Sequence, residues 1–116
     1  MRAALPPGET GHPQSPDDEA LARRIGTGAD LFVLASMDDC LPCTLMKPIV
    51  RRLASRLSVE LRLAEPATTP GFLERHAVDC FPELMLWRDG SLLERRVGFH
   101  GFDDLDVFTR RALGRP

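Results

Sequence analysis

The sequence feature that most limits the possible folds is a pair of cysteines placed between two segments of different periodicity. Residues 31–35 are apolar at every position, which is typical of a strand covered on both faces. Residues 44–57 show helical periodicity instead. The segment Cys40-Leu41-Pro42-Cys43 lies between them, so we expect Cys40 where a buried strand leads into the first turn of a helix.

The two thiols have the spacing of a redox centre, because cysteines separated by two residues can close a small, reversible disulfide. A helix N-terminus presents unpaired N–H groups and a partial positive charge, which favour the thiolate. Asp38 and Asp39 directly precede Cys40 and oppose its ionisation. We predict that Cys40 is the nucleophile.

Two other interpretations of the cysteines are a buried apolar pair and a zinc site. A tetrahedral zinc site needs four ligands, and the chain offers one CxxC pair, Cys80 and three scattered histidines. We therefore favour redox chemistry and predict no metal and no cofactor.

The helix that follows the cysteines is expected to bury one apolar stripe. The residues at four-residue spacing are Leu45, Ile49, Leu53 and Leu57. Pro48 interrupts this helix and should bend it. Residues 59–63 then alternate apolar and charged side chains and predict a second strand, so strand, helix and strand imply a right-handed parallel crossover.

Turn and cap signals divide the rest of the chain into further elements. Ser15 and Pro16 suit the start of a helix that ends at Gly26. The later elements are a short helix at 70–77, a β-hairpin at 84–87 and 92–97 with an Asp89-Gly90 turn, and an amphipathic helix at 102–113. This order predicts an α/β fold in which a βαβ unit precedes a ββα unit, with a mixed four-stranded sheet flanked by helices.

Length and composition limit the domain organisation and the partners. At 116 residues the chain is the size of one domain, which we place at residues 15–116. Residues 1–14 are rich in Pro and Gly and are expected to form a mobile tail. The net charge is −2 and no basic cluster alternates with aromatic residues, which argues against nucleic acid as a partner. We find neither a signal peptide nor an apolar run of bilayer length, so we expect a cytoplasmic protein without a membrane partner.

The order of elements, with CxxC opening the helix after the first central strand, resembles the thioredoxin family. The further matches are Pro48, Phe81-Pro82, Asp89-Gly90 and Val97-Gly98. The resemblance extends from about Asp17 to Leu113. It implies a thioredoxin-like sheet of four strands, or of five.

The resemblance also implies how a client would dock. In this family the proline that matches Pro82 is cis and lies against the disulfide, where its ring shields the thiols from metal ions. The backbone at Phe81 would then be presented to an incoming peptide, beside Leu41 and Pro42. Phe81 is also a candidate apolar platform for the client.

The chain departs from the family at positions close to the chemistry. Asp39 stands where thioredoxins usually have Trp, and Leu41-Pro42 replaces the usual Gly-Pro. Leu34 and Leu63 match positions that usually carry a buried Asp and a Lys. Because that acid assists proton removal from the second thiol, its absence predicts slower resolution of a mixed disulfide.

The predicted function is thiol-disulfide exchange with protein thiols or disulfides, in which Cys40 attacks and Cys43 resolves. A reductase or a thioredoxin-like electron donor would recycle the pair, and we expect a monomer or weak dimer. The alternative is an assembly factor that binds clients through the same groove, with redox chemistry secondary or vestigial. Cys80, two residues before Pro82, is either a third reactive thiol or a packing cysteine.

Overall fold

The computed structural model describes residues 14–116. The expected mobile tail, residues 1–14, lies outside the described residues except for Gln14. Among the described residues, no helix combines the length and the apolar character that crossing a bilayer requires.

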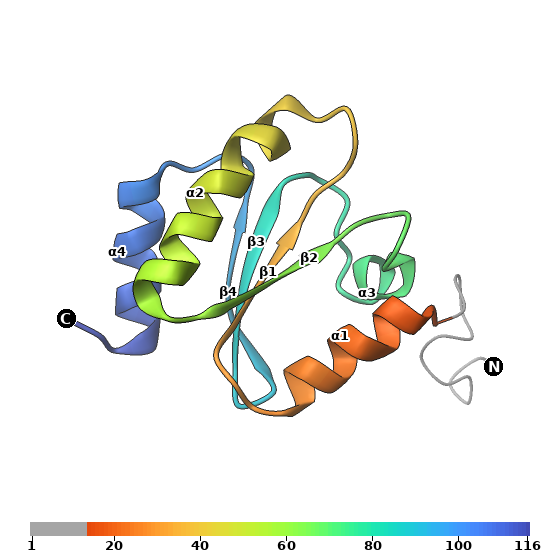
Figure 1. The fold of residues 1–116 in the computed structure, drawn as a ribbon, viewed down its shortest axis with the longest axis horizontal. Helices are drawn as coiled ribbons and strands as arrows, with labels where there is room; N and C mark the ends of the chain where they lie inside the picture. Colours follow the sequence, from red (N-terminus) through yellow and green to blue (C-terminus); the bar gives the residue numbers. More distant parts are fainter. Residues whose placement is uncertain (1–13) are drawn as a thin grey trace.

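The described residues form four helices and four strands (Figure 1). In chain order these are α1 (Pro16–Gly26), β1 (Leu31–Ala35), α2 (Leu41–Leu57), β2 (Glu60–Ala64), α3 (Pro70–Arg75), β3 (Glu83–Arg88), β4 (Ser91–Val97) and α4 (Phe102–Leu113). The strand order in the sheet is β2-β1-β3-β4. Strand β1 pairs parallel with β2 and antiparallel with β3, and β3 pairs antiparallel with β4. The predicted α/β fold with a mixed four-stranded sheet is confirmed.

Helices cover both faces of this sheet, which explains why β1 is apolar at every position. Phe32 and Leu34 point into a core formed with α2 and α4. The alternate residues of β1 point into a second core formed with α1 and α3. All five residues of β1 are completely buried, as expected for a central strand with two covered faces.

The buried face of α2 differs from the predicted stripe. Met46 and Val50 are buried beside Leu53 and Leu57, whereas Leu45 is 52% exposed and Ile49 is half-buried. Strict four-residue spacing drifts around a helix of 3.6 residues per turn, so a buried stripe alternates steps of three and four. The helix continues through Pro48.

A buried carboxylate joins α1 to α3. Ser15 and Asp18 form a capping box at the start of α1, as the Ser-Pro signal predicted for the cap. The Asp18 carboxylate also accepts hydrogen bonds from the backbone N–H groups of Gly71 (3.1 Å) and Phe72 (2.9 Å) at the start of α3. Asp18 is 2% exposed, so these N–H donors replace the hydrogen bonds that its carboxylate would form with water.

Replacing Asp18 by asparagine should destabilise the fold and weaken its dependence on acid. Burial raises the pKa of Asp18, but the backbone N–H groups of Ser15, Phe72 and Gly71 hold it below its ordinary value. A depressed folded-state pKa contributes stability that is complete above about pH 4 and is lost as pH falls through the folded value. We expect Asp18→Asn to lower the free energy of unfolding at pH 7 by about 1–3 kcal/mol. Urea unfolding from pH 7 to pH 2 checks this; an equally steep acid dependence in both proteins would contradict it.

The α1/α3 side of the sheet also contains an aromatic cluster. The ring of His76 lies between Phe72 and Trp87, with ring centroids 4.5 Å and 5.2 Å away. Burial, together with the positive charges of Arg75 and Arg95, lowers the pKa of His76. His76 immediately follows α3, so the cluster packs the end of this helix against β3.

Candidate active site

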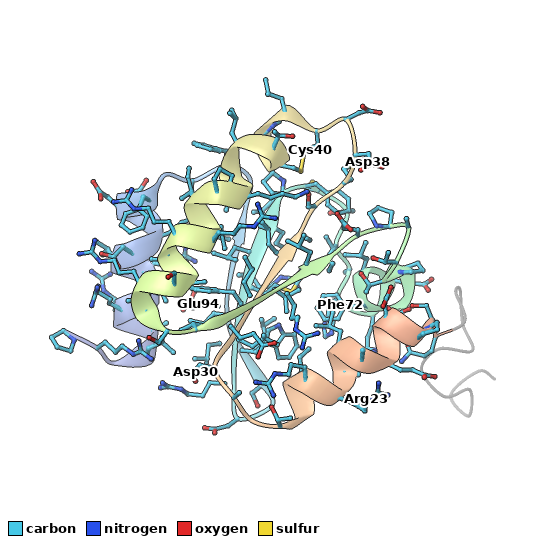
Figure 2. All side chains as sticks on the ribbon, in the orientation of Figure 1. Arg23, Asp30, Asp38, Cys40, Phe72 and Glu94 are labelled. Carbon is cyan, nitrogen blue, oxygen red and sulfur yellow. A yellow bond between two sulfur atoms is a disulfide. The ribbon has the colours of Figure 1, made fainter. Side chains whose placement is uncertain are left out.

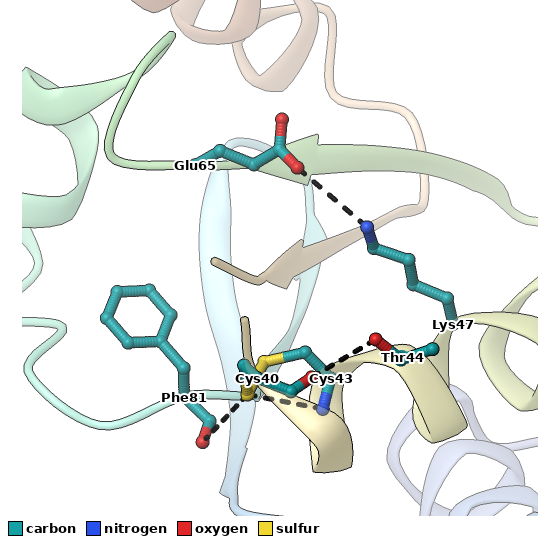
Figure 3. The surroundings of a disulfide bond; sticks show 6 residues. All are labelled: Cys40, Cys43, Thr44, Lys47, Glu65 and Phe81. Carbon is teal, nitrogen blue, oxygen red and sulfur yellow. Dashed lines mark hydrogen bonds and ion pairs between the residues drawn. A yellow bond between two sulfur atoms is a disulfide. The ribbon is translucent and has the colours of Figure 1, made fainter. Parts of the chain in front are cut away.

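The two cysteines of the CxxC segment are joined in a disulfide at the N-terminus of α2 (Figure 3). Their Cα atoms are 5.2 Å apart. Cys40 is half-buried, whereas Cys43 is 1% exposed. This asymmetry leaves Cys40 as the cysteine that an external thiol or disulfide can reach.

Local backbone geometry places the Cys40 sulfur at the positive end of the helix. Cys40 is the N-cap residue of α2, and its Sγ accepts a hydrogen bond from the Cys43 N–H at 3.3 Å. Thr44 Oγ1 donates to the Cys40 carbonyl at 3.2 Å. A sulfur at this position is stabilised as a thiolate by the helix dipole and the free N–H groups. The N-terminal helix position predicted for Cys40 is thus what the structure contains.

Asp38 and Asp39, the two carboxylates that precede Cys40, lie at the end of the sheet where β1 leads into α2. Figure 2 shows Asp38 near Cys40 where β1 leads into α2, with Asp30 at the opposite end of β1. Asp38 and Asp39 are exposed, and Asp39 has a positive φ of 55°. No acidic residue occupies the first turn of α2, so the negative charges nearest to Cys40 along the chain are those of Asp38 and Asp39, which oppose the helix dipole.

The structure brings the Phe81-Pro82 segment against the cysteines from 41 positions away in sequence. The Phe81–Pro82 peptide bond is cis. Cys40 Sγ lies 4.0 Å from the carbonyl oxygen of Phe81. The Pro82 carbonyl accepts a hydrogen bond of 2.7 Å from the N–H of Gly98, directly after β4. Cys40, Phe81, Pro82 and Gly98 therefore lie next to one another at this end of the sheet.

Leu41, Pro42 and Phe81, three of the predicted docking residues, are accessible to different extents. Leu41 is 68% exposed, Pro42 is exposed and Phe81 is half-buried, while Pro82 is buried. Cys80 is a free, exposed thiol. Its exposure is inconsistent with the packing interpretation.

Sequence reasoning missed part of this surface. A hollow of about 370 Å³ is lined by Met37, Asp38, Asp39 and the segment 65–67. A second hollow of about 370 Å³ shares Pro66 and extends to Phe81. The segments after β1 and β2 could have been placed together in advance, because the carboxyl ends of neighbouring parallel strands meet at one edge of a sheet.

Leu34 and Leu63, the positions that match the usual buried Asp and Lys, carry apolar side chains in this protein. Leu34 is completely buried and pairs in register with Leu63 across β1 and β2. The charged groups drawn near the disulfide are instead Lys47 and Glu65, whose side chains are 3.9 Å apart (Figure 3). Within residues 14–116, no three His, Cys, Asp or Glu side chains converge as a metal site would require.

Comparison with known proteins finds sequence similarity to thioredoxins. No family model matches the chain. The thioredoxins of Chlamydia trachomatis and Chlamydia muridarum are each 33% identical to it over 67 residues, which cover 57% of this chain. The chain is therefore similar in sequence to thioredoxins. The matched region spans 66% of each chlamydial thioredoxin, just under two thirds of its length.

Solved thioredoxin structures share the fold of this protein. A point mutant of the thioredoxin from Halobacterium salinarum superposes with a TM-score of 0.74 at 22% identity, covering 84% of this chain and 93% of that one. Oxidised mitochondrial thioredoxin 3 from Saccharomyces cerevisiae gives a TM-score of 0.72 at 18% identity, covering 80% and 88%. At these identities the likeness establishes the thioredoxin fold.

Proposed function

We propose that this protein is a protein-disulfide oxidoreductase that uses the Cys40–Cys43 pair. In the reducing direction, the Cys40 thiolate attacks a client disulfide, forms a mixed disulfide and releases one client thiolate. Cys43 then loses its proton and attacks Cys40 Sγ, which releases the second client thiolate and closes the Cys40–Cys43 disulfide. Two electrons pass from the dithiol to the client, and the reverse sequence oxidises a client dithiol.

The observation that carries this proposal is the unequal exposure of two bonded cysteines at a helix N-terminus. The half-buried Cys40 can meet a client, and the buried Cys43 is reserved for the intramolecular step. A reductase or thioredoxin-like donor would return the pair to the dithiol state. A CxxC pair in a chain with three cysteines is typical of a reducing compartment, which supports a cytoplasmic location.

Client docking is proposed to use Leu41, Pro42, Phe81 and Pro82. The exposed Leu41 offers an apolar contact, and the Phe81 backbone beside Cys40 offers polar groups to an extended segment of the client. Cys80, close by in sequence, is proposed as an accessible third thiol.

Reduction of insulin by dithiothreitol tests the proposal. We expect the protein to shorten the lag before the insulin B chain precipitates, whereas a Cys40→Ser, Cys43→Ser double variant should leave the lag unchanged. Equal lags for the two proteins would reject the redox function.

The second candidate function is client binding or assembly with secondary redox activity. The apolar Leu34–Leu63 pair favours it, since neither leucine can take the proton from Cys43 as the Asp expected from the resemblance would. A binding factor should hold clients equally well after both cysteines are replaced by serine, whereas an oxidoreductase should lose its covalent partners.

Neutralising the two carboxylates before Cys40 should make the reduced thiol more reactive. Asn is tolerated at the positive φ of Asp39, so Asp38→Asn, Asp39→Asn changes charge and preserves backbone geometry. Together the two exposed carboxylates oppose the thiolate by about 0.4–1.4 kcal/mol, so we expect about 2- to 10-fold faster alkylation at pH 7. Iodoacetamide kinetics on reduced protein measure this, with the remote pair Asp103→Asn, Asp104→Asn as control. Unchanged or slower alkylation would contradict the electrostatic argument.

A further inference from the structure

One arginine side chain joins the two ends of the loop that carries Phe81 and Pro82. This loop leaves α3 at His76 and enters β3 at Glu83. Arg95 lies on the neighbouring strand β4; its Nε donates to the Glu83 carboxylate, and its Nη2 donates to the His76 carbonyl at 2.8 Å. The guanidinium therefore bridges the first and last residues of the segment.

The bridge is anchored by a buried charge. The Glu83 side chain is 3% exposed, whereas both partners of the nearby pair Arg96–Glu94 are about 40% exposed. A carboxylate withdrawn from water requires its partner, while an exposed pair opens and closes at little cost. Arg95 is thus held at Glu83, and its second donor fixes the His76 carbonyl.

Side-chain packing and few backbone hydrogen bonds hold the middle of the loop, since Val78 is buried in the core on the α3 side and Phe81 packs against that core. Val78 N–H donates to the Leu73 carbonyl on one side, and Gly98 N–H donates to the Pro82 carbonyl on the other. Within the described residues, the backbone of 79 and 80 forms no such hydrogen bond. The place of the Phe81 carbonyl, 4.0 Å from Cys40 Sγ, therefore depends on this packing and on how the two ends of the loop are held.

We propose that Arg95 is a positioning residue that sets the 76–83 loop against Cys40 for reaction with protein clients. The inference rests on the proposed function, and Arg95 acts through the loop without touching the reacting sulfur atoms. The planar guanidinium presents several N–H groups in a fixed fork, whereas a lysine is a single point charge on a flexible stem. A lysine at this position keeps the charge opposite Glu83 and loses the bridge to His76.

Two substrates separate loop positioning from thiol chemistry. Hydroxyethyl disulfide needs only an accessible Cys40 thiolate, whereas insulin must also align its backbone beside Phe81. We expect Arg95→Lys to lower kcat/KM for insulin at least 10-fold and to change the rate with hydroxyethyl disulfide less than 2-fold. Arg96→Lys is the matched control, because Arg96 lies on the same strand, packs on Phe108 and, within the described residues, hydrogen-bonds Glu94 and the Arg95 carbonyl, neither of which belongs to the loop. Both of its rates should stay within 2-fold of the wild type.

The test distinguishes failure of the positioning role of Arg95 from failure of the proposed oxidoreductase function. If wild-type protein reduces insulin and Arg95→Lys matches it, or loses both reactions equally, the positioning role is overturned. If wild-type protein fails with insulin, the proposed function itself is rejected. Should Arg95→Lys fail to fold, Glu83→Leu, Arg95→Leu removes the bridge without leaving an unpaired buried charge, and the same selective loss with insulin is expected.

Discussion

Client proteins will be recovered in covalent complexes with a Cys43→Ser variant and not with a Cys40→Ser variant. The first retains the accessible nucleophile and lacks the thiol that resolves the mixed disulfide, so the intermediate accumulates. The second retains only the buried Cys43, which is 1% exposed. We expect at least a 10-fold difference in trapped adducts, measured by mass spectrometry after expression in cells.

The free thiol of Cys80 has to be removed for this comparison. Cys80 is exposed and could form disulfides of its own, so both variants are made in a Cys80→Ser background. Equal trapping by the two variants would overturn the assignment of attacking and resolving roles. Loss of most adducts on removing Cys80 alone would assign the nucleophile to Cys80.

Introducing a carboxylate at Leu34 should improve resolution of a mixed disulfide and reduce stability. Leu34 is completely buried between Leu63 of β2 and Leu84 of β3. The resemblance places a buried Asp at this position, from which an aspartate would take the proton from Cys43 as this thiol attacks. It also buries a polar group in an apolar core, and we expect the free energy of unfolding to fall by about 3 kcal/mol or more. Single-turnover release of a client, with unfolding measured on the same sample, checks both effects.

Leu34→Asn is the matched control, since asparagine has a similar size and polarity but cannot accept the proton as a general base. It should destabilise the protein without accelerating release. A folded Leu34→Asp protein with unaltered release would show that the missing acid does not limit the reaction.

Features encoded locally in the sequence were predictable, whereas those that depend on distant partners were not. The Asp89-Gly90 turn was recognisable because both residues adopt positive φ, which these residue types tolerate. The Ser15 cap was recognisable for a similar reason, because its partner is three residues away. By contrast, Asp18 accepts a hydrogen bond from Gly71 in α3, which lies 53 positions later in the sequence. No local sequence pattern predicts such a contact.

In the candidate site, too, locally encoded features were predictable and contacts with distant residues were not. The CxxC spacing and the adjoining strand and helix located Cys40 and Cys43, and resemblance to a family located Pro82. The Arg95–Glu83 pair was invisible in the sequence, because charged residues on a hairpin are normally exposed and carry no sign of burial. The expected buried face of α2 is wrong at Leu45 because strict four-residue spacing drifts around a helix of 3.6 residues per turn.

The fluorescence of Trp87 should report on the α3 side of the molecule and not on the disulfide. Trp87 is the single tryptophan of the chain and lies five residues along β3 from Pro82, about 16 Å at the usual rise per residue. Its indole packs against His76 and Phe72. Emission should therefore change when the α3 side of the molecule loosens or when His76 is protonated, and should remain nearly constant when the disulfide is reduced.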